Sequence, residues 1–312
     1  MPEPAVSTLP TPKMTPMQDR AILGTAVVPW TDRFEFDEAA FDQQVAAIAR
    51  GLTPYLYVFG TAGEGYAVSE AQFRQIATAF WKSSLRHSAQ PMLGVISLSL
   101  GTVIERIEFG RALGYREFQL SLPSWGALND TELDRFFAES CGRFPDCRFL
   151  HYNLSRAGRI LGATEYRRLV AAHPNLVAVK TGIQDPVKVR ELMDLSPRLR
   201  FFFTEFGYAE ARTVGDCGLL ISLSSVSDRR GLEFVSCDDA RRREMIVQLR
   251  EMLATLLRLG SGRYHMDGAF DKLLYRMKAP DFPLRLLPPY AGPTEADAAA
   301  LRASLGEAWR SP

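Results

Sequence analysis

The sequence has few of the residues from which metal centres and disulfide frameworks are built. It contains 4 cysteines and 4 histidines among 312 residues. The cysteines lack C-x-x-C spacing and the histidines form no H-x-x-x-H pair, so we expect no metal site. Cysteines used in this way are typical of reduced thiols in a reducing compartment, and we therefore expect a cytoplasmic protein.

The sequence also lacks an excess of charge of either sign. Its formal net charge is +1, from 37 Lys and Arg against 36 Asp and Glu. So weak a net charge attracts neither nucleic acid nor an anionic membrane surface, and we expect neither as a partner. No apolar run reaches the length needed to cross a bilayer. Residues 1–20 hold five prolines and no apolar core of the kind found in export signals, so we expect a flexible leader there.

What the sequence does have is a regular alternation of short apolar runs and longer amphipathic stretches. The apolar runs, which are typical of buried parallel strands, lie at 21–28, 55–59, 92–96, 117–122, 148–152, 176–180, 199–203 and 219–223. A helical pattern follows each run, the last over residues 238–259. Eight such units predict an α/β fold, a (β/α)8 TIM barrel over residues 21–235. Residues 236–312 are expected to hold the last barrel helix and a C-terminal helical extension.

Lys180 is the most informative residue, because the active site of such a barrel lies at the C-terminal ends of its strands. It closes the apolar run 176–179 and shares a strand face with the small Ala178. Loss of hydration there lowers the pKa of the lysine and favours the neutral amine, the nucleophile that forms a Schiff base. The alternative is that Lys180 ends its strand and extends into solvent.

Two further candidates stand at other strand ends. Tyr152 ends the preceding strand, where its hydroxyl can relay a proton to Lys180; the alternative is a core tyrosine. Gly60-Thr61-Ala62-Gly63-Glu64 follows the second strand. Its two glycines allow a tight turn that directs several backbone N–H groups at one point, an arrangement that binds a carboxylate or phosphate. The Thr61 hydroxyl could also transfer a proton. An ordinary strand-to-helix turn is the alternative.

Together these stretches resemble the dihydrodipicolinate synthase and N-acetylneuraminate lyase family. That family has a G-T/S-T-G-E loop, then Y-N-x-P-x-R-T, then a strand ending in the Schiff-base lysine. The corresponding residues here are Gly60 to Glu64, then Tyr152-Asn153-Leu154-Ser155-Arg156-Ala157-Gly158, then Val179-Lys180. Weaker similarities extend the resemblance over roughly residues 20–309.

The resemblance implies a barrel with C-terminal helices that assembles as a homotetramer, a dimer of dimers, and uses no metal or organic cofactor. It implies that Lys180 forms an imine with a 2-oxo acid such as pyruvate. It also implies that Tyr152 and Thr61 relay protons and that the amides from Gly60 to Gly63 hold the carboxylate of the acid.

Three departures from the family pattern bear on the substrate. Ala62 stands where the family usually has a second threonine, and in Pro123-Ser124-Trp125 an indole replaces a phenol that the synthases supply from a neighbouring subunit. Arg156 lies one residue closer to Tyr152 than the family arginine, which in the synthases meets the carboxylate of the second substrate. These changes argue against a lysine-biosynthetic synthase. The residues expected to shape the substrate pocket are Trp125, Arg156, Ile221 and Ser222.

We therefore expect a Schiff-base lyase or aldolase that acts on pyruvate or a related 2-oxo acid, with an aldehyde that the sequence does not identify. Two alternatives stay open. One is a sugar-acid dehydratase that uses the same lysine imine, and the other is a non-catalytic keto-acid-binding protein on a decayed barrel.

Overall fold

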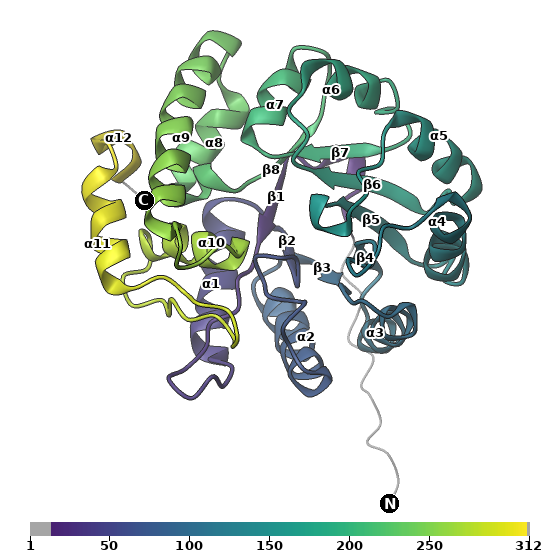
Figure 1. Cartoon of the computed structure of the whole chain (residues 1–312), viewed down its shortest axis with the longest axis horizontal. Helices are drawn as coiled ribbons and strands as arrows, with labels where there is room; N and C mark the ends of the chain where they lie inside the picture. Colours follow the sequence, from purple (N-terminus) through teal and green to yellow (C-terminus); the bar gives the residue numbers. More distant parts are fainter. Residues whose placement is uncertain (1–13, 311–312) are drawn as a thin grey trace, which may run out of the picture.

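The computed structural model describes residues 14–310, in which eight parallel strands close into a barrel. Each strand pairs with its neighbours in the sequence, and the last pairs with the first. The strands are β1 (Ile22–Thr25), β2 (Tyr55–Val58), β3 (Gln90–Gly94), β4 (Glu117–Leu120), β5 (Arg148–Asn153), β6 (Leu176–Thr181), β7 (Arg200–Phe203) and β8 (Gly218–Leu220). The predicted (β/α)8 barrel is confirmed, and Figure 1 shows its strands surrounded by helices.

A helix follows each strand and contributes to the outer layer. These helices are α1 (Glu38–Gly51), α2 (Glu70–Arg86), α3 (Leu100–Leu113), α4 (Asp130–Phe137), α5 (Ala163–Ala172), α6 (Pro186–Met193), α7 (Glu205–Arg212) and α8 (Asp228–Ser236). The C-terminal extension adds α9 (Asp239–Gly260), α10 (Asp267–Arg276), α11 (Glu295–Ser304) and α12 (Glu307–Arg310). In Figure 1 the yellow helices α11 and α12 lie beside α9 on one side of the barrel.

The helix expected over residues 238–259 is confirmed as α9, but it is preceded by a helix that was not expected, α8. Two helices are present, because the Ser227 side chain accepts a hydrogen bond from the N–H of Arg230 and begins α8. Asp238 then begins α9 in the same way, by accepting from the N–H of Arg241. Two consecutive helices, α8 and α9, therefore follow β8 between Asp228 and Gly260.

Two layers of apolar side chains stabilise the barrel. A small cluster fills its interior and combines Leu23, Tyr57, Met92, Leu150, Ala178, Phe202, Leu220 and Met17. A larger cluster lies between the strands and the surrounding helices. Alternate residues of a strand point to opposite faces, so the interior position of Ala178 places Lys180, two residues on, inside the barrel as well.

The segment before β1 packs against the N-terminal end of the barrel. Met17 lies in a short helical turn, Met17–Asp19, and joins the interior cluster. Arg20 is fully buried and donates from both terminal nitrogens to Glu117, at 2.6 and 2.7 Å. Of the predicted leader, residues 1–13 lie outside the described residues, and residues 14–20 are part of the packed barrel.

Candidate active site

Lys180 points into the barrel at the end of β6, and other side chains of the barrel enclose its own. The residue is 2% exposed and pairs in register with Tyr152 of β5. Its Nζ donates a 2.9 Å hydrogen bond to Oε1 of Gln119 on β4. It also lies 3.7 Å from the ring centroid of Tyr152 and 3.9 Å from that of Tyr57 on β2. The alternative of a lysine extending into solvent is therefore wrong.

The surroundings of Lys180 favour a reactive amine. Burial lowers the pKa of this lysine to about 7, against a smaller opposing effect of the Asp267 and Asp271 carboxylates on α10. Within residues 14–310, the lysines that form ion pairs are Lys272 and Lys278, so the Lys180 amine is not neutralised in that way. Neutral amine is thus plentiful near pH 7, and the two tyrosine faces still accommodate the charged form.

Tyr152 and Thr61 lie next to the amine and next to each other. The Tyr152 hydroxyl is 3.2 Å from the Thr61 Oγ1, within hydrogen-bonding distance. Burial raises the pKa of the Tyr152 phenol above its ordinary value, so the phenol keeps its proton at neutral pH. Lys180 contacts the face of the Tyr152 ring. The arrangement brings a proton donor and a second hydroxyl to the rim of the Lys180 site.

The loop after β2 approaches Lys180 most closely at Gly60. A Cβ on Gly60 would lie 3.1 Å from the Lys180 Nζ and 2.7 Å from Cε2 of Tyr57, so only glycine leaves this space open. At Gly63 a Cβ would lie 2.7 Å from the backbone nitrogen of Phe59, which shows how tightly the loop turns. Both glycines are needed for the turn that the sequence predicted. The binding of a carboxylate by its amides stays a prediction.

Ala62 and Glu64, in the same loop, face away from the amine. Ala62 packs with Val27 and Phe282, so its methyl group belongs to a separate apolar cluster. Glu64 is fully buried and accepts hydrogen bonds from Nε1 of Trp30 at 2.9 Å and from the N–H of Leu287 at 2.7 Å. The carboxylate of Glu64 thus serves to hold the loop in place.

A cleft of about 610 Å³ leads from Thr61 to the surface. Its walls come from the segments after β2, β3, β4 and β5 and from the C-terminal extension, and they include Ser121, Arg156 and Met266. Arg156 donates to a carboxylate oxygen of Asp267 at 3.3 Å and to the carbonyl of His265 at 3.5 Å. Arg156 therefore stands at the rim of the cleft, where it is already paired with α10.

The remaining predicted pocket residues are not beside Lys180. Trp125 is 90% exposed, in the loop after β4. Ile221 packs in the layer between strands and helices, whereas its neighbour Leu220 faces the barrel interior. Ser222 uses its backbone N–H to donate to Glu205 at 2.9 Å. The binding of substrate by Ile221 and Ser222 stays a prediction, and the side chain that β8 presents to the barrel interior is that of Leu220.

Gln119 and Tyr57, which both contact the amine, were not predicted from the sequence, and neither were the acidic residues of α10. A signal for Gln119 was present. Glu117, Gln119 and Ser121 are polar residues at every second position of a strand that is otherwise apolar, and this spacing puts them on one face. No comparable pattern pointed to Asp267 or Asp271, because their helix follows the barrel in the sequence.

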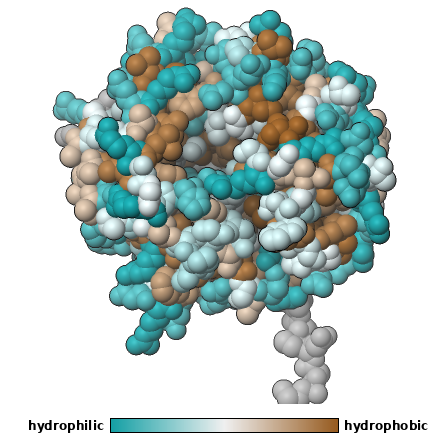
Figure 2. All heavy atoms as spheres, viewed as in Figure 1, coloured by the Kyte–Doolittle hydropathy of each residue, from teal (hydrophilic) through white to brown (hydrophobic). Residues whose placement is uncertain are grey.

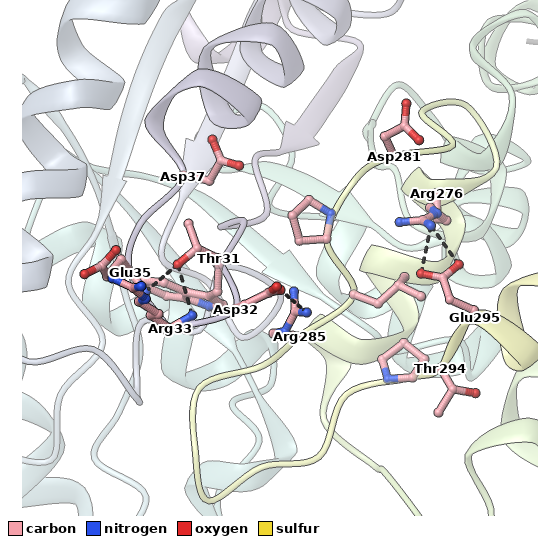
Figure 3. Close-up of a pocket in the computed structure, with 14 residues that line it drawn as sticks. Thr31, Asp32, Arg33, Glu35, Asp37, Arg276, Asp281, Arg285, Thr294 and Glu295 are labelled. Atoms are coloured by element: carbon pink, nitrogen blue, oxygen red, sulfur yellow. Dashed lines mark hydrogen bonds and ion pairs between the residues drawn. The ribbon is translucent and has the colours of Figure 1, made fainter.

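A second, wider groove lies away from Lys180, between the segment after β1 and the segment after α10. It has a volume of about 860 Å³ and is lined mainly by charged side chains. Figure 3 shows Arg285 pointing at Asp32 and Arg276 at Glu295, and both pairs are in contact. Since two of its three arginines are paired in this way, we assign no chemistry to this groove.

Neither a metal site nor a membrane span emerges from the described part of the chain. Within residues 14–310, no three or more His, Cys, Asp or Glu side chains are grouped so as to hold a metal ion. No helix there is both long and apolar enough to cross a bilayer. The 4 cysteines are unpaired thiols. Figure 2 shows hydrophilic and hydrophobic residues intermingled on the face that it presents.

Comparison with known sequences identifies similar proteins over much of the chain. The sequence profile of the dihydrodipicolinate synthetase family matches residues 18–204. A 4-hydroxy-tetrahydrodipicolinate synthase from Thermus thermophilus is 29% identical over 155 residues, which cover 49% of this chain and 51% of that protein. The match thus spans about half the length of this curated relative.

Comparison with solved structures shows the same fold in two proteins with different descriptions. YagE, a prophage protein of the dihydrodipicolinic acid synthase family from E. coli K12 determined in complex with pyruvate, has a TM-score of 0.80 at 14% identity, covering 91% of this chain and 97% of that chain. N-acetylneuraminate lyase from Proteus mirabilis has a TM-score of 0.77 at 15% identity, covering 91% and 96%.

Proposed function

Because this chain belongs to the dihydrodipicolinate synthetase family, we propose that it is a Schiff-base lyase or aldolase acting on pyruvate or a related 2-oxo acid. The observation that carries the proposal is the position of the Lys180 Nζ. It is buried inside the barrel and lies 3.7 Å from the ring centroid of Tyr152. The structural neighbour from E. coli K12 binds pyruvate, which supports the choice of substrate.

The residues around Lys180 suit each step of imine formation. The neutral amine attacks the keto carbon and forms the C–N bond of a carbinolamine. The carbinolamine then loses its hydroxyl as water, which requires a proton at oxygen and releases one from nitrogen. The Tyr152 hydroxyl, paired with Thr61, is the group best placed to carry these protons. The amides from Gly60 to Gly63 would hold the carboxylate of the acid.

The imine makes the carbon skeleton of the acid an electron acceptor. In the synthetic direction C3 loses a proton, and the resulting enamine attacks an aldehyde to form a C–C bond. In the cleavage direction the bond between C3 and C4 breaks and an aldehyde leaves. Water then hydrolyses the imine and returns the free Lys180 amine. We propose that the aldehyde occupies the 610 Å³ cleft beyond Thr61.

The second substrate is not expected to be that of the lysine-biosynthetic synthases. Arg156 is paired with Asp267 at 3.3 Å, so it is not free to receive a carboxylate without first giving up that contact. The methyl group of Ala62 packs away from Lys180, and the Trp125 indole is in solvent. These features favour an aldehyde other than that of the synthases.

A homotetramer is part of the proposal. Leu98 is 58% exposed and Trp125 is 90% exposed, on neighbouring loops at the barrel mouth. Large apolar side chains left in solvent favour burial against another subunit. Light scattering on the purified protein would test this, and a monomer at micromolar concentration would contradict it.

The direct test of the function is reductive trapping. The protein is incubated with pyruvate and sodium borohydride, and the intact protein and its peptides are weighed. We expect one irreversible adduct per chain, located on Lys180. Lys180→Met should abolish it, whereas Lys188→Met, which removes an exposed lysine on α6, should leave it unchanged.

Three outcomes separate the hypotheses. An adduct on Lys180 together with turnover to an aldehyde supports a lyase or aldolase. An adduct with loss of water from a sugar acid and no aldehyde supports the dehydratase. Binding of pyruvate without any adduct on Lys180 would overturn the Schiff-base proposal and favour a non-catalytic binding protein.

A further inference from the structure

Gln119 is a fully buried amide at the centre of the site, and half of its hydrogen-bonding capacity is unused. The residue has no exposed surface. Its Oε1 accepts from the Lys180 Nζ at 2.9 Å, but its Nε2 has no hydrogen-bond partner within the described residues. A buried donor without a partner is unfavourable, and such groups are rare in folded proteins. An unused N–H directed into an active site indicates a partner that arrives with the substrate.

The orientation of this amide follows from chemistry as well as from the coordinates. The Lys180 amine in its charged form has only donors, so the amide oxygen and not the amide nitrogen must face it. The Nε2 then lies on the side of the loop after β2. It is 3.6 Å from the point that a Cβ on Gly60 would occupy, and the Lys180 Nζ is 3.1 Å from the same point. Both nitrogens therefore border the space that glycine leaves open.

That space lies where the imine and the carboxylate of a 2-oxo acid would meet. In the protonated imine of such an acid, the N–H and one carboxylate oxygen stand side by side on one edge of the molecule. A primary amide carries the complementary pair, a carbonyl oxygen beside an N–H. Asn and Gln side chains recognise the adjacent donor and acceptor of adenine by the same two-point pairing.

We propose that Gln119 recognises the imine of a 2-oxo acid at two points, its Oε1 accepting from the imine nitrogen and its Nε2 donating to the adjacent carboxylate oxygen. This inference rests on the proposed function. It makes Gln119 a specificity-determining residue, which favours ketones that carry a neighbouring carboxylate over ketones that lack one.

The test compares pyruvate with hydroxyacetone, a ketone of similar size without a carboxylate. Rates of reductive trapping with cyanoborohydride are measured by mass spectrometry over a range of ketone concentrations. In Gln119→Met, which keeps the length but removes the amide, we expect pyruvate trapping to slow by about 10- to 100-fold, as for loss of a hydrogen bond to a charged group. Hydroxyacetone trapping should change far less, so the ratio of the two rates should fall.

A second variant and a control make the result decisive. Gln119→Glu keeps an acceptor for the imine but repels a carboxylate, so it should lower the pyruvate to hydroxyacetone ratio at least as far as Gln119→Met. Gln44 on α1 is a matched control: it is 1% exposed, and both its amide atoms lack hydrogen-bond partners among the described residues. Gln44→Met should leave both rates unchanged. Circular dichroism confirms that each variant is folded.

The outcomes distinguish this inference from the proposed function. If the wild-type protein forms no pyruvate adduct on Lys180, the proposed function fails, and the role of Gln119 fails with it. If the wild-type protein forms the adduct but the Gln119 variants keep the wild-type ratio, only the role of Gln119 is overturned. An equal slowing of both ketones would also overturn it, because that result indicates an effect on the amine alone.

Discussion

Lys272 and Glu64 form an ion pair of 2.6 Å in which both side chains are fully buried. The pair joins α10 in the C-terminal extension to the loop after β2, which carries Gly60 and Thr61. Glu64 also accepts from the N–H of Leu287, further along the extension. The extension therefore does more than cover the barrel, because it fixes the position of the loop that borders Lys180.

We predict that Lys272→Met destabilises the protein strongly. It leaves the Glu64 carboxylate buried without its cation, and breaking a buried pair in this way lowers the free energy of unfolding by about 3–5 kcal/mol. Urea denaturation followed by circular dichroism measures this loss. The double variant Glu64→Gln, Lys272→Met should recover part of it, because it removes the unpaired charge.

A surface pair provides the comparison for this prediction. Arg143 and Glu108 are 3.0 Å apart with side chains that are 51% and 49% exposed. Arg143→Ala should lower the free energy of unfolding by less than about 1 kcal/mol. An equally small loss for Lys272→Met would show that the buried pair does not hold the loop to the extension.

The pH dependence of trapping should reflect the environment of the amine. Burial lowers the pKa of Lys180 to about 7, so the rate of pyruvate trapping should rise as the pH passes through 7 and level off above it. The Asp267 carboxylate opposes this lowering of the pKa. In Asp267→Asn the midpoint of the pH profile of the trapping rate should therefore move to lower pH. Cyanoborohydride trapping between pH 5 and 9 measures both midpoints.

The control for this pH shift is an exposed aspartate outside the barrel mouth. Asp281 lies in the loop after α10 and lines the wider groove of Figure 3. Asp281→Asn should keep the wild-type midpoint. A wild-type midpoint near the ordinary pKa of lysine, or an upward shift in Asp267→Asn, would contradict this view of the site.

How far the sequence alone predicted this molecule depended on how local each signal is. The eight apolar runs are local patterns, so the barrel followed from them. The lysine that ends the sixth run left two alternatives open, burial or extension into solvent, and the structure shows burial. The orientation of the side chains at the end of β8 could not be predicted from such a pattern. Residues 218–221 are apolar without alternation, and an offset of one residue exchanges the two faces of a strand. The sequence therefore did not show that Leu220 faces the interior.

The acidic residues near Lys180 could not be predicted from the sequence, for a different reason. Asp267 and Asp271 lie on α10, 87 and 91 residues after Lys180. Their helical pattern does not reveal which face of the barrel they approach. Trp125 illustrates the same limit for loops, since its 90% exposure depends on a loop conformation that composition does not determine. Contacts between distant segments have to be observed.

Tyr152→Phe should separate proton transfer from packing. The variant keeps the aromatic face that lies 3.7 Å from the Lys180 Nζ but removes the hydroxyl that contacts Thr61. Loss of a general acid–base group slows a reaction by about 10²- to 10⁴-fold, so we expect a fall of that size in the rate of imine formation. Stopped-flow trapping with pyruvate measures it.

Tyr115→Phe is the matched control for that prediction. Tyr115 is also fully buried, but its hydroxyl donates to the backbone carbonyl of Ala77 at 2.8 Å, far from the amine. Its loss should cost about 1 kcal/mol of stability and leave the trapping rate unchanged. If Tyr152→Phe behaves like Tyr115→Phe, then the phenol of Tyr152 is not the proton carrier.

Gly60→Ala should impair the site although the substitution adds only one methyl group. The new Cβ would stand 3.1 Å from the Lys180 Nζ and 2.7 Å from Cε2 of Tyr57, so both side chains must move. Displacement of a reacting group by about 1 Å costs on the order of 10²-fold in rate, and we expect pyruvate trapping to slow by that factor. Crowding of this kind should lower the free energy of unfolding by about 1–3 kcal/mol, leaving the protein folded.

Gly126→Ala is the control for this prediction. Its Cβ would meet no atom of the described residues within 4 Å, so its trapping rate and its stability should match those of the wild type. Normal trapping by Gly60→Ala would mean that the space beside residue 60 is not where the substrate binds.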